Sequence, residues 1–145
     1  MAFGVLLGAL AGSWTAPTWP APPSIRVDAA WIRWLPADVP AAGYLTLIND
    51  SDHPIVLVAA ESVDFQDVTI HRSVEHAGLV GMEPVREISV DPHSRLEFGA
   101  KGYHLMLMHP VRSIATQTQI SVTLRFRDGT SLPVPFQVRK AGAGS

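Results

Sequence analysis

The sequence of 145 residues contains no cysteine. Disulfide bonds are therefore excluded, and so is the blue-copper type of electron-transfer site, because that site requires a cysteine thiolate. Runs of basic residues are missing as well: 11 Lys and Arg stand against 13 Asp and Glu, and the formal net charge is −2. This pattern gives no basic surface for nucleic acid, so we expect the partners to be a metal ion or another protein.

Long hydrophobic runs are also scarce. The apolar run at residues 2–12 has the length of the central region of a signal peptide and falls well short of the roughly 20 residues that span a membrane. Within it, residues 9–11 (Ala-Leu-Ala) fit a signal cleavage site, although no Lys or Arg precedes Arg26. We therefore expect an exported protein, or one tethered to a membrane by an uncleaved N-terminal segment.

The domain organisation follows from this N-terminal segment. Four prolines between residues 17 and 23 separate the apolar run from the remainder as a stiff linker. We interpret residues 1–23 as the signal-like segment with its linker, residues 24–140 as a single domain, and residues 141–145 as a flexible tail. The apolar content of 47% is enough for one core in a chain of this length.

The pattern after residue 24 predicts an all-β fold. Helical periodicity is hard to find, whereas short apolar or alternating runs recur about every ten residues between turn residues, as in sandwiches and barrels. We expect strands at residues 25–34, 43–49, 55–60, 67–74, 79–90 with a break at Pro84, 94–98, 103–109, 119–127 and 131–139.

The last two strands form the clearest predicted hairpin. Even-numbered positions are apolar in both, and matching them across the pair requires a three-residue loop, which we place at residues 128–130. Pro133 and Pro135 lack N–H donors, so the final strand should lie at a sheet edge or pair on one side only.

The most informative residues are His71, Met82, His104 and Met106. Their spacing is His, ten residues, Met, twenty-one residues, His, one residue, Met. The whole sequence holds only six His and four Met, so chance does not account for this spacing. Imidazole nitrogen and thioether sulfur together suit Cu(I) far better than Mg, Ca or Mn, so the set predicts a Cu(I) site.

Local geometry supports two pairs within this set. In an extended strand His104 and Met106 share one face, Leu105 and Leu107 occupy the other, and Met108 continues the first face as a possible substitute ligand. A two-residue loop at residues 76–77 or 77–78 would place His71 and Met82 on one face of a hairpin, directly opposite or diagonal. Spacing alone does not bring the two pairs together.

The motif resembles that of the PCu(A)C-type periplasmic copper chaperones, in which a His is followed by Met after ten residues and a His-x-Met comes later. The resemblance extends over residues 25–139 and includes residues 28–33, 42–47 and 102–107. It implies a monomeric, cupredoxin-like Greek-key β-sandwich or barrel that binds Cu(I) near its surface through the two His and two Met. It also implies delivery of copper to a copper-accepting protein such as a cytochrome c oxidase subunit. Arg72 departs from relatives that have Met directly after the first His.

The sequence shows no motif for enzymatic chemistry, and we expect no enzymatic activity. The sequence has no Gly-rich phosphate loop, no G-x-S-x-G elbow and no H-E-x-x-H helix. The remaining histidines are expected at the surface, with His109 next to the site strand: His53, His76, His93 and His109. Two alternatives stay open: a copper-binding redox or storage protein, and an immunoglobulin-like interaction module without metal.

Overall fold

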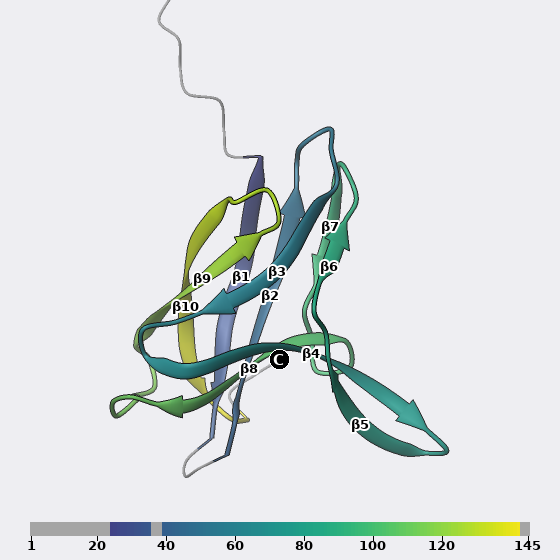
Figure 1. Cartoon of the computed structure of the whole chain (residues 1–145). Coiled ribbons are helices and arrows are strands. Elements are labelled where there is room, and N and C mark those ends of the chain that lie inside the picture. The colour runs from purple at the N-terminus through teal and green to yellow at the C-terminus, as the bar shows by residue number, and fades with distance from the viewer. Residues whose placement is uncertain (1–23, 36–38, 143–145) are drawn as a thin grey trace, which may run out of the picture.

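The structure is a computed structural model, which describes residues 24–35 and 39–142. The predicted N-terminal segment and most of the predicted tail lie outside the described residues. In the described part every regular element is a strand, which confirms the all-β prediction (Figure 1). The strands are β1 (Ile25–Trp34), β2 (Ala41–Asn49), β3 (Ile55–Glu61), β4 (Phe65–His76), β5 (Leu79–Pro84), β6 (Ile88–Val90), β7 (Ser94–Glu97), β8 (Tyr103–Pro110), β9 (Gln119–Phe126) and β10 (Ser131–Lys140).

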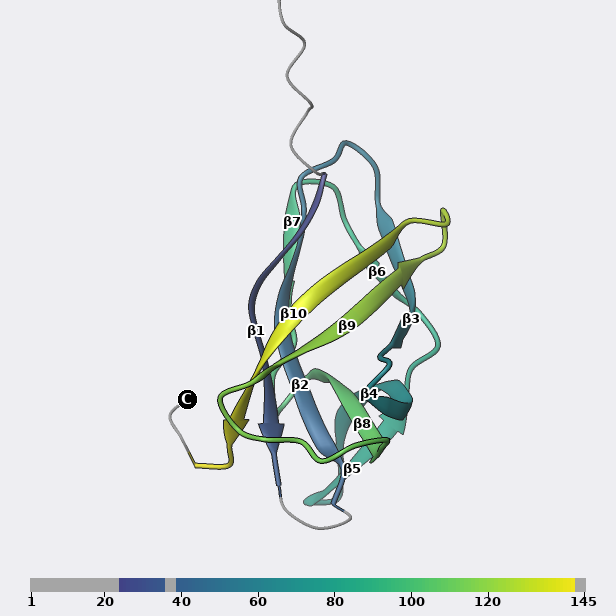
Figure 2. The same cartoon turned by 90° about the vertical axis from the view of Figure 1, so that its left-hand side faces the viewer.

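The strands form one continuous sheet that curls around a single core. Their order is β5-β4-β8-β2-β1-β10-β9-β3-β6, with β7 paired to β2. All pairs are antiparallel except β1 with β10. Figure 2 shows β9 and β10 crossing in front of β1 and β2. Fully buried side chains fill the space that the curled sheet encloses, including Leu45, Leu57, Leu107, Val122 and Phe136. Within the described residues no helix is long and apolar enough to cross a membrane.

The hairpin of β9 and β10 confirms the predicted pairing of even positions, since Leu132 lies opposite Leu124. The predicted loop at residues 128–130 is wrong by one residue. Phe126 N–H donates to the carbonyl of Thr130 at 2.9 Å, so the three loop residues are 127–129. Gly129, with φ of 90°, occupies the third loop position, where a left-handed residue is required. Parity of the alternation fixes which faces match, but the position of the glycine decides where the chain turns.

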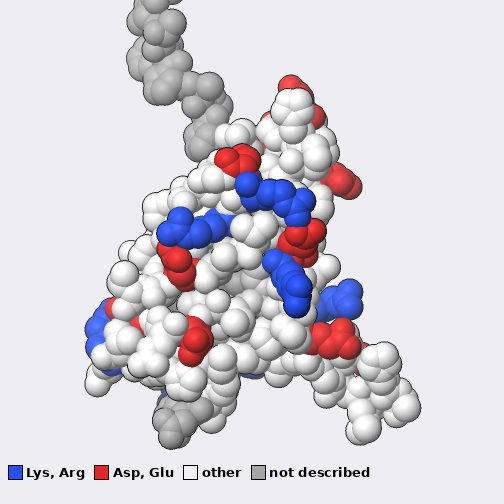
Figure 3. All heavy atoms as spheres, viewed as in Figure 1, with Lys and Arg blue, Asp and Glu red and all other residues white. Residues whose placement is uncertain are grey.

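The prolines of β10 lie where the strand has one neighbour. Pro133 and Pro135 pair with β9, whereas pairing with β1 begins only at Gln137. The prediction that this strand lies at a sheet edge or pairs on one side only is wrong, because β10 lies inside the sheet between β1 and β9. The missing N–H groups are tolerated because they fall in the part of β10 that has only β9 as a neighbour. Figure 3 shows basic and acidic side chains next to one another over one face of the molecule. Two ion pairs join Arg125 of β9 to Glu61 of β3, and Arg127, just after β9, to Glu87, just before β6.

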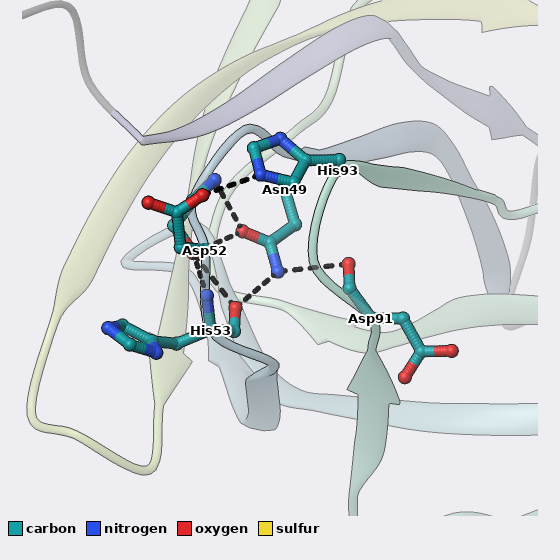
Figure 4. Close-up of polar contacts among 6 residues, drawn as sticks. Asn49, Asp52, His53, Asp91 and His93 are labelled. Atoms are coloured by element: carbon teal, nitrogen blue, oxygen red, sulfur yellow. Dashed lines mark hydrogen bonds and ion pairs between the residues drawn. The ribbon is translucent and has the colours of Figure 1, made fainter.

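Asn49, at the end of β2, joins two loops to the core (Figure 4). Its side chain is fully buried, and its amide nitrogen lies 2.8 to 3.1 Å from the carbonyl oxygens of His53, Val90 and Asp91. Its amide oxygen accepts from the backbone N–H and the hydroxyl of Ser51. One side chain thus satisfies buried backbone groups from the segments that follow β2 and β6.

Replacement of Asn49 by Ala should lower the free energy of unfolding by about 2 to 3 kcal/mol, because it leaves buried carbonyl groups without donors. His53→Ala is the matched control: its side chain is exposed and only its backbone takes part, so its effect should stay within about 0.5 kcal/mol. Urea unfolding of both variants measures the difference. Equal stabilities would show that water replaces the amide at no cost.

Candidate metal centre

The pairing of β4 with β8 brings the two histidines of the motif together. His71 lies directly opposite His104, and Thr69 lies opposite Met106. Leu105 and Leu107, on the other face of β8, are fully buried. Hydrophobic burial of one face therefore turns His104 and Met106 toward the opposite face, as the alternation predicts.

The backbone of β8 is also held closely by β2. Gly43 lies opposite Leu105, and a Cβ at this glycine would meet the Cβ of Leu105 at 3.2 Å. The absence of a side chain at Gly43 lets β8 pack closely against β2 and the core. It thereby fixes the distance of His104 and Met106 from the core.

A tight hairpin adds the first methionine. Ala77 and Gly78 have φ of 51° and 77°, which is the two-residue turn with both central residues left-handed. Of the two predicted registers, the structure has the one with the loop at residues 77–78, which places Met82 opposite Ser73 and diagonal to His71. All four residues of the motif therefore lie on one face of the sheet formed by β5, β4 and β8.

The ring of His104 is oriented by the loop that precedes it. Its Nδ1 lies 3.2 Å from the carbonyl oxygen of Gly102, and its Nε2 lies 3.2 Å from Sδ of Met82. Because a carbonyl can only accept, Nδ1 is the donor in its contact, and Nε2 is the ring nitrogen that faces the thioether. Holding one ring nitrogen through a backbone carbonyl is the usual way in which proteins fix a metal-binding histidine.

His71 is partly buried, and its ring centroid lies 6.0 Å from that of His104. Its Nδ1 is buried and has no hydrogen-bond partner among the described residues. Burial lowers the pKa of His71 below its ordinary value of 6.5, and the imidazole of His104 lowers it further. The ring is therefore kept neutral, which is the form that can coordinate a metal.

A cavity of about 340 Å³ opens beside these groups. Met82, His104 and Met106 line it, together with side chains from β1, β2 and the residues that adjoin those strands. His71 is not among the lining residues but lies beside the cavity, because it is paired with His104 across the two strands. Met82 is 59% exposed whereas His104 is 6% exposed, so the site runs from the protein interior to the solvent.

The other residues weighed from the sequence lie apart from this group. Met108 and His109 line a separate cavity with Trp34, and Nδ1 of His109 lies 2.7 Å from the carboxylate of Asp67. The remaining histidines are exposed, as predicted: His53, His76 and His93.

Three features of the site had no signal in the sequence. The carbonyl of Gly102 orients His104, and Arg33 and Tyr44 line the cavity from strands far away in the chain. Nε of Arg33 is buried without a partner among the described residues. A backbone carbonyl leaves no trace in side-chain patterns, and these cavity walls depend on long-range strand pairing.

The donor set defines the chemistry that the site can perform. No three His, Asp or Glu side chains converge in the part of the chain that the structure describes. A cluster of hard oxygen ligands is therefore not formed there, and the available donors are two imidazoles and two thioethers. Such a set favours a soft ion such as Cu(I).

Solved structures share this architecture. The copper-bound PCuAC domain from PmoF2 aligns with a TM-score of 0.68 at 23% identity, covering 81% of this chain and 94% of that one. The solution structure of CuI-DR1885 from Deinococcus radiodurans aligns with a TM-score of 0.68 at 28% identity, covering 87% of this chain and 85% of that one. The fold is that of a PCuAC domain, which confirms the family resemblance and the single β-domain expected from the motif.

Comparison of the sequence with known families shows to which family the chain belongs. The family described as "Putative lipoprotein LpqE-like" matches residues 25–138, so the chain belongs to the LpqE-like family. A relative from Leifsonia xyli subsp. xyli, "Putative lipoprotein Lxx21020", is 28% identical over 116 residues, which cover 79% of this chain and 69% of the relative.

The lowered pKa of His71 predicts a pH-dependent stability of the metal-free chain. Above about pH 6.5 the group is neutral in both states and adds no pH dependence. As the pH falls below that value, the unfolded chain takes up the proton first, so the free energy of unfolding decreases until the pH passes the lowered pKa. Urea unfolding between about pH 8 and pH 5 measures this slope.

Two variants separate His71 from the other histidines. His71→Gln should lose this part of the slope, whereas His76→Gln, at the exposed end of β4, should keep it. Equal slopes in the parent and in His71→Gln would contradict the assigned pKa.

Proposed function

We propose that this protein is an exported Cu(I) carrier that holds the ion through His71, Met82, His104 and Met106. The observation that carries the proposal is the geometry of His104: one ring nitrogen is held by a backbone carbonyl, and the other is directed at a thioether 3.2 Å away. Relatives of the same fold support it, since one is described as a copper-bound PCuAC domain and another is named as the Cu(I) form.

The arrangement of the donors suits transfer better than permanent storage. His104 is buried and oriented, while Met82 lies on an exposed strand. A partner with thiolate ligands can replace the exposed thioether first and the others afterwards, because thiolates bind Cu(I) strongly and this chain contains none. We therefore propose a metallochaperone without enzymatic activity, for which absence of turnover in the copper-loaded state is the expected result.

We propose the location from the family to which the chain belongs, and the acceptor from the ligands that Cu(I) prefers. The family description contains the word lipoprotein, which supports export to the periplasm or to a membrane surface. The proposed acceptor is a copper-accepting protein with thiolate ligands, such as the copper-binding subunit of cytochrome c oxidase. The carrier is proposed to act as a monomer.

The first test is Cu(I) competition binding under reducing conditions. The chain should bind one Cu(I), and the double change Met82→Leu with Met106→Leu should abolish binding while the fold is kept. Leu is close to Met in volume, so the cost in stability should stay below about 1.5 kcal/mol. Met108→Leu is the matched control, because Met108 shares the strand but lines the other cavity, and it should retain the stoichiometry. Unchanged binding in the double variant would refute the assigned site.

The second test is transfer. Cu(I)-loaded protein mixed with the reduced dithiol domain of a cytochrome oxidase subunit should lose its copper to that domain, because thiolate is the stronger ligand. Prior alkylation of the acceptor thiols should prevent the loss. If the loaded protein keeps its copper at equilibrium, approached from both directions, a storage role becomes the better account.

A further inference from the structure

Strand β5 forms an edge of the sheet that is bare over Leu79–Met82, since its one charge and its one proline come at its end, at Glu83 and Pro84. Among the described strands it pairs with β4 alone, and all six of its residues are exposed. Leu79 and Val80 are 77% and 76% exposed, and residues 77–82 carry no charge. Figure 3 shows the end of this hairpin as an uncharged projection from the body of the protein. Proteins usually shield such edges with charges, prolines or bulges, because a bare edge pairs with other chains.

The opposite edge of the sheet is built differently. It is formed by β6, which has three residues, and two of them are buried. Arg127 and Glu87 form an ion pair beside it. An uncharged, proline-free stretch of exposed edge is therefore found at Leu79–Met82 and not at β6, and Glu83 and Pro84 mark where that stretch ends.

The free backbone groups of this edge can be assigned from the register. Hydrogen-bonded pairs alternate along an antiparallel ladder. Val85 N–H donates to the carbonyl of Ile70 at 2.8 Å, so this pair belongs to the bonded set. By alternation, Gly81 is bonded toward β4, while Val80 and Met82 direct their N–H and C=O groups away from β4. A proposed metal ligand is thus also one of the residues whose backbone is free to pair.

We propose that an extended segment of the copper acceptor adds to the sheet along β5 and places a soft side chain opposite Met82. This inference rests on the proposed Cu(I) site. Directly opposed residues in neighbouring strands have Cβ atoms about 4.5 to 5.5 Å apart on the same face. A thiolate in that position reaches an ion held by Met82, given metal–sulfur bonds of about 2.3 Å. Main-chain pairing supplies the docking, as in other strand-addition complexes, and the soft side chain supplies the selectivity.

The size of the edge favours a transient acceptor over a second copy of this chain. Stable complexes bury about 1,200 to 2,000 Å² in total, which a six-residue strand cannot provide without further contacts. Small interfaces are typical of brief encounters in which electrons or signals are exchanged. Transfer of an ion has the same requirement, since the acceptor must leave after it is loaded.

The test compares two synthetic peptides as acceptors for the Cu(I)-loaded chain. The first, Thr-Val-Cys-Thr-Cys-Val-Thr, forms a strand with both thiols on one face. In the second, the backbone nitrogens of both cysteines are methylated, which removes the N–H groups that would face β5 in an antiparallel pairing and keeps both thiols. After correction for the peptides' own Cu(I) affinities, transfer to the first should be about tenfold faster, as expected for the loss of one or two backbone hydrogen bonds. Equal rates would overturn the proposal.

Variants of Val80 test the edge from the side of the protein. Val80→Pro removes an outward N–H and leaves the bonds to β4 in place, whereas Val80→Thr keeps the donor and the β-branched shape. Both should keep the parent's Cu(I) affinity within about twofold, but only Val80→Pro should lose the preference for the first peptide. If Val80→Pro disturbs the hairpin, Val80→Lys takes its place, because a charge on the edge discourages pairing. A preference that survives in the edge-blocked variant would refute docking at β5.

A readout without copper separates this inference from the proposed function. A peptide with serine in place of both cysteines, added to the metal-free chain, should protect the amides of Val80 and Met82 from hydrogen exchange. Protection in a chain that binds no Cu(I) would support the docking edge and refute the carrier. Copper transfer without protection would refute the docking edge and leave the carrier intact. Protection that appears at high protein concentration without peptide would assign the edge to a second copy and overturn the proposal.

Discussion

The register between β4 and β8 is the constraint on which the rest of the site depends. Leu105 and Leu107 are buried in the core, so the alternate residues His104 and Met106 must face the other side. A slip of one residue would expose both leucines, at about 1.5 to 3 kcal/mol each, and would bury an imidazole in their place. The hydrophobic core therefore specifies the donor geometry, although no donor belongs to it.

The local parts of this arrangement were predictable from the sequence. Alternation along residues 103–109 gave the two faces of β8, and the turn candidate before Leu79 gave a hairpin with His71 and Met82 on one face. These features depend on neighbours a few residues apart, so side-chain pattern and turn chemistry suffice. The same reasoning limited the last hairpin: alternation fixed the matching faces of β9 and β10 but left the loop one residue out of place.

The parts that escaped prediction depend on distant segments. Nothing in the sequence indicates that β4 pairs with β8 across the intervening strands, and the resemblance to a known family supplied that step. The carbonyl of Gly102 and the cavity walls around Arg33 arise from where the chain folds back, which no periodicity encodes. Met108 shows the converse limit, because it shares a strand face with the proposed donors and yet lines another cavity. A common face is necessary for a common site, but the direction and reach of each side chain decide membership.

The two ends of the site differ in how firmly they are held, and this difference bears on release. His104 lies between β4 and β2, above fully buried leucines, and a backbone carbonyl fixes its ring. Met82 lies on an edge strand that is exposed along its whole length and has a partner on one side only. Segments with few buried contacts open at lower free energy than core strands. An ion shared by these donors is therefore most easily freed from Met82, at the edge where an incoming strand can pair. In the proposed arrangement the buried imidazole of His104 and the partly buried imidazole of His71 would retain the ion while the acceptor's first ligand replaces the thioether.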